Sequence, residues 1–580
     1  MRAYFVILSA AWLAAMGGCG GARPPSAAHA GMPASTASAA AEPRVDAMPR
    51  VPVTVADWAA GARLYEGLGT AHRPITTSSP DAQKYFDQGL RFMWAFNHDE
   101  ATRSFAKAAE LDPKCASCFW GVSLTVGPNY NLPFLVKERA KVAREALDRA
   151  GENSLPASAV EKALIGALAR RYPTASPLDP TTARPILIAY AAAMQAVAAQ
   201  YPQDLDVQTF YAEALMNVNA WKLWTADGKP APGTEQIVAT LESVLKRAPG
   251  HPGANHYYVH AIEASPHPEK AVAAAERLKN LMPAAGHLVH MPAHIMQRIG
   301  RYEDAAEANR KAAAEDEVYG AHTHPPDYYP VMYTAHNYQF LAYSAAMEGR
   351  KAETLAATDN SRRVVADDML LAMPGVDWYV AESYAARLRF GLWDEMLALP
   401  APNSHLTALT GGFLYGRALA LAAKGRLQEA KAALGELEKF AAAVPAGAPA
   451  GQNSVKDLMG IAIPVVQARI AAAEKRPQEA ISFLGQAVAR EDGIAYDEPD
   501  NWFFPARHIL GAQLLQAGRA SEAESVYRED LARNPKNGWA LYGLSAALKA
   551  QGKAAEAAQA AAQFETAWQR ADVSLSASAF

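Results

Sequence analysis

Cysteine is scarce in this chain, with three among 580 residues, and so are long hydrophobic runs and stretches of basic charge. Beyond the N-terminal segment, no apolar run is long enough to cross a bilayer as a helix, which excludes a polytopic membrane protein. The formal net charge is −4 and no long Lys/Arg run is present, which argues against a nucleic-acid partner. We therefore expect the body of the chain to be soluble.

The N-terminus has the features of a targeting segment rather than of folded structure. Arg2 precedes an apolar core that is too short for a transmembrane helix, and the sequence MGGC that follows resembles a bacterial lipobox. This resemblance implies a signal peptide over residues 1–18 and lipidation of Cys19. Because Gly20 is not the aspartate of inner-membrane retention, it also implies a lipoprotein at the periplasmic face of the outer membrane. The alternative is a secretory peptide cut at Ala28-His29-Ala30, which would give a soluble periplasmic or secreted protein.

Two features are interpreted in the light of export. Residues 19–53 are rich in Ala, Pro and Ser, and they cannot bury enough apolar surface to offset the entropy of ordering, so we predict a disordered tether. If Cys19 is lipidated, Cys115 and Cys118 remain as a pair in an oxidising compartment, where a disulfide is the favoured state. A metal or redox role is the alternative for this pair. The Phe that follows Cys118 excludes the c-type haem attachment motif.

Helical patterns dominate from residue 54 onward, because Ala is abundant and apolar residues recur at three- and four-residue steps. The segment 82–115 resembles a tetratricopeptide repeat, a helix–turn–helix of 34 residues. This resemblance implies an all-α fold, an α-solenoid of antiparallel helix pairs that forms a curved superhelix. The residues at repeat positions 8, 11, 20, 24, 27 and 32 are Gly89, Phe92, Ala101, Phe105, Ala108 and Pro113.

The same frame recurs along the chain. Adjacent repeat pairs start at 82 and 116, 252 and 286, 377 and 411, and 504 and 538, with a single repeat near 335 and a degenerate one around 469–490. Blocks such as YFDQGLRFMWAFNHDEA (85–101) and HLVHMPAHI (287–295) also resemble a group of exported bacterial tetratricopeptide proteins, a similarity that supplies no activity. The predicted organisation is an N-terminal repeat pair over 54–131, irregular helices over 132–250, a His-rich repeat segment over 252–350 with an insertion at 320–334, repeat-like helices over 351–503 and a C-terminal pair over 504–580.

Histidines gather in one part of the sequence, since ten of the fifteen fall between His251 and His336. The repeat resemblance implies that positions 2, 5, 9 and 12 of each first helix face the concave groove. Helical spacing agrees, because two sets of residues follow i, i+4, i+7 and i, i+3, i+7 and so form a stripe on each of two helices. The residues expected in the groove are His256, His260, Glu263, His287, His290, His294 and His336.

This constellation predicts a site for a divalent transition metal, and the number of ligands also allows a binuclear centre. Imidazole-rich ligation suits zinc, copper, iron or nickel rather than calcium or magnesium. Asn255, Tyr257 and Asn337 are candidates to orient the ligands from behind. The alternative is a polar groove whose histidines hydrogen-bond a peptide or buried carbonyl groups.

Two local features limit the metal hypothesis, and an insertion beside the cluster bears on access to the groove. Pro292 would break a helix that runs from His287 to His294 and could remove the first histidines from the stripe. The residue after His256 is Tyr257, so HYYVH lacks the glutamate of the metalloprotease motif HExxH. The insertion at 320–334 is either a lid over the groove or a Pro-fixed connector that packs on the edge of the solenoid.

Residues outside the groove receive simpler interpretations. Four histidines beside Pro or Gly are predicted to lie at the surface: His251, His267, His322 and His324. The segment 498–505 (EPDNWFFP) is predicted to serve packing. Spacing alone supports no nucleophile–base pair, so no catalytic residue is assigned.

The sequence therefore supports two functional hypotheses. The first is a binding scaffold whose concave groove holds a protein, a peptide or a small ligand, with a His-rich site that binds a transition metal and a lipid anchor as its only membrane contact. The second is a metal-dependent enzyme whose active site is the His/Glu cluster.

Overall fold

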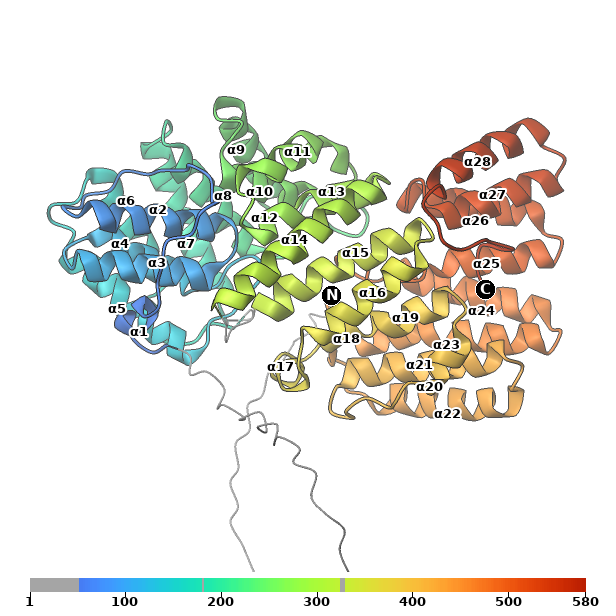
Figure 1. The fold of residues 1–580 in the computed structure, drawn as a ribbon. Helices are drawn as coiled ribbons and strands as arrows, with labels where there is room; N and C mark the ends of the chain where they lie inside the picture. Colours follow the sequence, from blue (N-terminus) through green and yellow to red (C-terminus); the bar gives the residue numbers. More distant parts are fainter. Residues whose placement is uncertain (1–51, 180–181, 324–328) are drawn as a thin grey trace, which may run out of the picture.

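The computed structural model describes residues 52–179, 182–323 and 329–580, which fold as an all-α solenoid of antiparallel helix pairs of the tetratricopeptide type (Figure 1). The predicted signal peptide, the lipidation residue Cys19, nearly all of the predicted tether and His324 lie outside the described residues. Within the described part of the chain, no helix is both long and apolar enough to cross a membrane.

The helices follow one another as hairpins along the chain (Figure 1). The N-terminal half contains α1 Val55–Ala59, α2 Pro80–Trp94, α3 His98–Leu111, α4 Ala116–Thr125, α5 Lys137–Glu152, α6 Ala159–Leu168, α7 Arg184–Gln200, α8 Leu205–Val218, α9 Thr234–Arg247, α10 Pro252–Ile262, η1 Pro268–Ala271, α11 Val272–Leu281, α12 Gly286–His290, α13 Pro292–Arg298 and α14 Tyr302–Thr323. The C-terminal half contains η2 Pro330–Thr334, α15 Ala335–Met347, α16 Lys351–Arg363, α17 Asp367–Ala372, α18 Asp377–Val380, α19 Glu382–Arg389, α20 Trp393–Ala398, α21 Thr407–Ala423, α22 Leu427–Ala443, a short hairpin of β1 Pro449–Ala450 and β2 Asn453–Ser454, α23 Val455–Ala473, α24 Pro477–Glu491, α25 Ala506–Gln516, α26 Ala520–Arg533, α27 Gly538–Ala550 and α28 Ala554–Ala567.

Small residues let neighbouring helices approach closely. Gly89 on α2 and Gly121 on α4 both lie against the ring of Phe105 on α3, and a methyl group added at either glycine would overlap that ring. Phe105 is fully buried, so its ring fills the space that the two glycines leave. This contact explains why the repeat pattern pairs small and large residues on facing helices.

The turn between the two helices of a repeat requires a left-handed backbone. Gly300 (φ 72°) occupies this position between α13 and α14, and Gly349 (φ 71°) occupies it between α15 and α16. Glycine is favoured there because it has no Cβ to clash. In the turn between α2 and α3 the same position is held by Phe96 (φ 53°), which is buried. An L-residue with a large side chain is costly in this conformation, which suggests that the ring itself is needed.

The buried hydrophobic residues form two large clusters that meet at α15. One cluster extends from α1 to Phe340, and the other extends from Val331 to α28. Ala335 and Phe340 lie on the same helix but belong to different clusters. Helix α15 therefore lies where the two halves join, and this is also where the histidines gather.

Candidate metal centre

Three helical segments, separated along the chain by α11 and α14, turn their histidines toward one another. Helix α10 carries His256 and His260, with Glu263 at its C-terminal end, and α15 carries His336. The remaining three histidines of the cluster come from α12 and α13. All of them except His336 are at most 2 % exposed, and His336 is partly exposed. The predicted residues thus come together, but inside the protein rather than along an open groove.

Pro292 breaks the second helical segment without dispersing its histidines. Helix α12 ends at His290 and α13 begins at Pro292, as expected for a residue without an N–H. Met291 between them keeps helical torsion angles (φ −50°, ψ −34°). The direction of the chain is therefore preserved, and His294 stays on the same side as His290.

The inward-facing side chains form three groups, and the side chains of each group offer nitrogen or oxygen atoms that could bind one metal ion. Within each group the candidate nitrogen or oxygen atoms lie within 4.8 Å of one another. Ligands bound to one ion at about 2.0–2.1 Å are roughly 3 Å apart, so modest side-chain rotations would close each group around an ion. The groups are His256, His260 and His287; His290, His294 and His336; and His260, Glu263, His294 and Glu498.

Three of the imidazoles are held through Nδ1 by hydrogen-bond acceptors. Nδ1 of His256 donates to the carbonyl oxygen of Trp94 (2.5 Å), and Nδ1 of His290 donates to Oδ1 of Asn309 (2.6 Å). Nδ1 of His260 donates to Oε1 of Glu263 (2.8 Å). A neutral imidazole that donates through Nδ1 has a bare lone pair on Nε2, which is how metal-ligating histidines are usually oriented.

The ring nitrogens that are not held in this way face other side chains that could bind a metal. Nε2 of His256 lies 3.1 Å from Nε2 of His287, and Nε2 of His290 lies 2.6 Å from Nε2 of His294. Nε2 of His260 and Nδ1 of His287 are buried and have no hydrogen-bond partner. Buried polar atoms without a partner are costly, so this arrangement favours a ligand that accepts several lone pairs at once.

A carboxylate that the sequence did not reveal completes the cluster. Glu498, in the connector between α24 and α25, places Oε2 2.7 Å from Nδ1 of His294, and Oε2 of Glu263 lies at the same distance from that nitrogen. Although they are close, these contacts lack hydrogen-bond geometry. The segment 498–505 therefore does more than pack. The only signal for this role in the sequence was a glutamate in a proline- and aromatic-rich connector.

Burial and charge set the protonation of the centre. Burial lowers the pKa of His256 to about 3, and burial together with the neighbouring histidines lowers the pKa of His260 well below its usual value. Burial also opposes charge on His294, but Glu498 and Glu263 outweigh it and raise the pKa of His294 to about 10. Burial and the charge of Glu498 raise the pKa of Glu263. Without metal, His294 is therefore protonated, and its positive charge offsets negative charge of the neighbouring carboxylates. The same position favours a metal cation.

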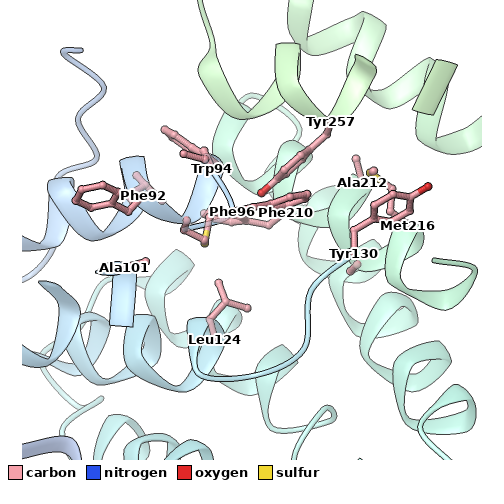
Figure 2. Packing of buried hydrophobic residues seen from close by; sticks show 14 of the residues in the cluster. Phe92, Trp94, Phe96, Ala101, Leu124, Tyr130, Phe210, Ala212, Met216 and Tyr257 are labelled. Atoms are coloured by element: carbon pink, nitrogen blue, oxygen red, sulfur yellow. The ribbon is translucent and has the colours of Figure 1, made fainter. Parts of the chain in front are cut away.

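Aromatic rings enclose the imidazoles. Phe96 lies nearly parallel to His260 and to His287, with ring centroids 5.6 and 5.8 Å apart. Figure 2 shows Phe96 beside Trp94 and Tyr257 in the core of the N-terminal half. Tyr333, from the predicted insertion, meets His287 at 4.8 Å. These rings exclude water, which strengthens electrostatic interactions within the centre.

The residues predicted to support the ligands do not hydrogen-bond them. Asn255 binds the carbonyl oxygens of Pro249 and His251 and the side chain of Arg277, and Asn337 binds Asp316. The ring of Tyr257 is tilted by 42° against the ring of His256, with the centroids 5.4 Å apart. Each of the three follows or precedes a histidine directly, and adjacent helical residues point about 100° apart. Trp94 and Asn309 take this role instead.

Two other predictions concern residues outside the centre. His251 was expected at the surface but is 9 % exposed, because its Nδ1 caps α10 and its Nε2 contacts Asp206. His267 is exposed, as expected. Cys115 and Cys118 are joined by a disulfide at the start of α4.

A cleft leads from the surface toward the carboxylates of the centre. A cavity of about 20 Å³ touches His294 and Glu498 and shares Arg298 and Asp500 with a cleft of about 980 Å³. The cleft is lined by residues of both halves, including Trp221 and Arg533. It provides a route for an ion or a small molecule to reach the centre.

Comparisons with known proteins find only distant similarity. No protein-family model and no curated protein matches the sequence. The human IFIT1 dimer with m7Gppp-AAAA is 11% identical, with 78% of this chain and 90% of that chain covered and a TM-score of 0.31. Yeast Tom70 is 12% identical, with 82% of this chain and 90% of that chain covered and a TM-score of 0.28. Similarity at this level carries no conclusion about ligands or activity.

Proposed function

We propose that this chain is a helical-repeat scaffold that binds divalent transition metal ions (zinc, copper or iron) in its buried histidine centre. The observation that carries the proposal is the orientation of the imidazoles. His256, His260 and His290 are fixed through Nδ1, and their Nε2 atoms face other ligand atoms or have no partner. A metal ion would satisfy these lone pairs together, and the donor set suits a borderline-soft cation.

The grouping of the ligands favours more than one ion. The two three-histidine groups have no residue in common, so each can hold an ion at the same time. The third group shares His260 and His294 with them and contributes the two carboxylates. We therefore propose two ions per chain, with the carboxylates on the side that faces the cleft.

The decisive experiment is metal analysis of protein purified without an affinity tag. We expect about two equivalents of a transition metal by elemental analysis, or the same uptake after the chelated protein is titrated with Zn²⁺ or Cu²⁺. His260→Ala and His294→Ala should each lower the metal content and abolish the thermal stabilisation by added metal. His405→Ala, at an exposed histidine, is the matched control. Equal metal content in all variants would refute the proposal.

A second candidate function is a metal-dependent enzyme, and the position of Glu498 at the small cavity beside the cleft favours it. A bound ion would supply Lewis acidity. Glu263, whose pKa is raised by burial and by Glu498, is the candidate to carry a proton in such a reaction. The test is hydrolysis of model esters and phosphoesters by the metal-loaded chain. An enzyme would lose activity in Glu263→Gln without a matching loss of metal, whereas a pure binding protein would show no turnover.

We also propose that the chain is exported and anchored by a lipid on Cys19, with a peptide or small ligand bound in the cleft between the halves. The disulfide between Cys115 and Cys118 supports an oxidising compartment. Metabolic labelling with a radioactive fatty acid in a bacterial host tests the anchor. Label should be present in the wild-type chain and absent from Cys19→Ala, and a chain that is never labelled would leave export without an anchor.

A further inference from the structure

Another cavity lies in the C-terminal half, and no histidine is among its lining residues. It is enclosed by α18, α19, α21 and the connector before α25, and its volume is about 30 Å³. One water molecule needs about 10–15 Å³ on this measure, so the cavity holds roughly two waters or one small head group. Its lining includes Trp378, Glu382, Tyr415, Trp502 and Phe504.

Besides Oδ1 of Asn501, three polar atoms of this lining lack a hydrogen-bond partner. They are Oε2 of Glu382, the hydroxyl of Tyr415 and the indole Nε1 of Trp502. The three residues are 8 %, 6 % and 4 % exposed, so water outside the protein does not satisfy these atoms. Buried polar groups are nearly always paired, and three unpaired groups around one cavity indicate that something else occupies it.

The charge of the lining indicates what the occupant is. Within the described residues Glu382 forms no ion pair, and burial together with the charge of Asp497 raises its pKa, so a bound cation would supply the missing countercharge. The remaining walls are aromatic faces, with Trp378 and Trp502 nearly parallel at 6.4 Å and Tyr415 at 5.2 Å from Trp502. An acid surrounded by aromatic faces is the environment that attracts an organic cation.

We propose that this cavity binds a primary alkylammonium group, such as the side-chain amine of lysine or the amine of a short diamine. The ammonium donates hydrogen bonds to the carboxylate of Glu382 and to the hydroxyl oxygen of Tyr415, and its charge faces the indole rings. A quaternary ammonium would leave the carboxylate without a donor, and a neutral alcohol would leave its charge uncompensated. The apolar stem of the ligand lies against Phe504 and Leu388.

This site is independent of metal binding, so it is tested on the full-length chain as purified. Butylammonium, butanol and tetramethylammonium are titrated separately, with tryptophan fluorescence and calorimetry as readouts. Butylammonium should bind at least about tenfold more tightly than either of the others, because a charge-assisted hydrogen bond is lost with each of them. Equal affinity for butanol would overturn the proposal.

Two variants assign the binding to Glu382. Glu382→Gln keeps the shape of the side chain. It should lower the affinity for butylammonium at least about tenfold and leave the affinity for butanol unchanged. Glu436→Gln, at an exposed acid of the same half, should bind as the wild type does. If Glu382→Gln does not fold, as judged by circular dichroism, Trp502→Phe provides the second test and should weaken butylammonium several-fold. Unchanged affinity in the folded variants would refute the site.

Discussion

Nδ1 of His294 lies 2.7 Å from Oε2 of Glu498, although α13 and the connector before α25 belong to opposite halves of the chain. The same nitrogen lies 2.7 Å from Oε2 of Glu263, which belongs to the same half as His294. One imidazole therefore joins carboxylates from both halves. The geometry of the centre depends on how the halves are held together, and metal binding should stabilise that arrangement.

The contribution of Glu498 can be measured directly. Glu498→Gln removes a negative ligand from the group that also contains His260, Glu263 and His294. We expect metal affinity to fall at least about tenfold in a competition titration against a chromophoric chelator. Glu479→Gln, at an exposed acid, is the control. An unchanged affinity would show that the carboxylate is not a ligand.

Asn309 should tune the centre without touching the metal. Its Oδ1 accepts from Nδ1 of His290, so Asn309→Leu frees the imidazole to rotate and to change tautomer. Metal affinity should fall about 10–100-fold, the usual effect of losing such a partner. Asn309→Asp retains an acceptor and should recover most of the affinity. A positioning role would be disproved if Leu and Asp had the same effect.

The metal-free protein should lose stability in mild acid. The buried ring of His256 has a pKa of about 3, whereas the unfolded chain has the ordinary value of 6.5. Between these values the unfolded state binds a proton that the folded state does not, so the free energy of unfolding falls as the pH falls below 6.5. At pH 5 this residue alone accounts for about 2 kcal/mol.

The measurement is urea denaturation in chelator at several pH values from 7.5 to 5. His256→Gln should show a shallower decline of stability with falling pH than the wild type. The exposed residue His267, replaced in His267→Gln, serves as the comparison. A wild-type stability that is flat from pH 7.5 to pH 5 would contradict the buried, neutral state of these rings.

Phe96 offers a test of backbone strain against burial. Phe96→Gly relieves the strain of a left-handed backbone conformation, which should raise the free energy of unfolding by about 1–3 kcal/mol. It also removes a buried ring, which should lower the free energy of unfolding by about 3–5 kcal/mol. We expect net destabilisation and weaker metal binding, measured by thermal unfolding and chelator competition. Lys475 (φ 60°) occupies the equivalent turn before α24 and is exposed. Lys475→Gly should therefore be neutral or stabilising, and a stabilised Phe96→Gly would show that the ring is dispensable.

The architecture and the clustering of the histidines could be predicted from the sequence because both depend on local periodicity. Recurrent small and large residues indicate helical hairpins, and helical spacing alone places His256 and His260 on one face. Pro292 then made the position of His287 uncertain, and the helical torsion angles at Met291 settle it.

Residues that act across the fold left no comparable pattern in the sequence. Glu498 reaches the centre from a connector without regular structure, and Asn309 reaches it from α14, so neither shares a periodicity with the histidines. Asn255 and Asn337 were candidates to orient the ligands, but each directly adjoins a histidine, and a helix turns neighbouring side chains apart. His251 was assigned to the surface from its Pro and Gly neighbours, whereas capping of α10 buries it.

The connector that carries Glu498 has a consequence for biosynthesis. A ribosome produces the chain from its N-terminus, so the imidazoles of α10 to α15 emerge long before this carboxylate. If the centre binds metal as proposed, the nascent protein would hold an incomplete set of ligands until residue 498 has been translated and its connector has docked. Tight loading with metal would then be a late event, and it would distinguish finished molecules from chains that stall or end before this residue.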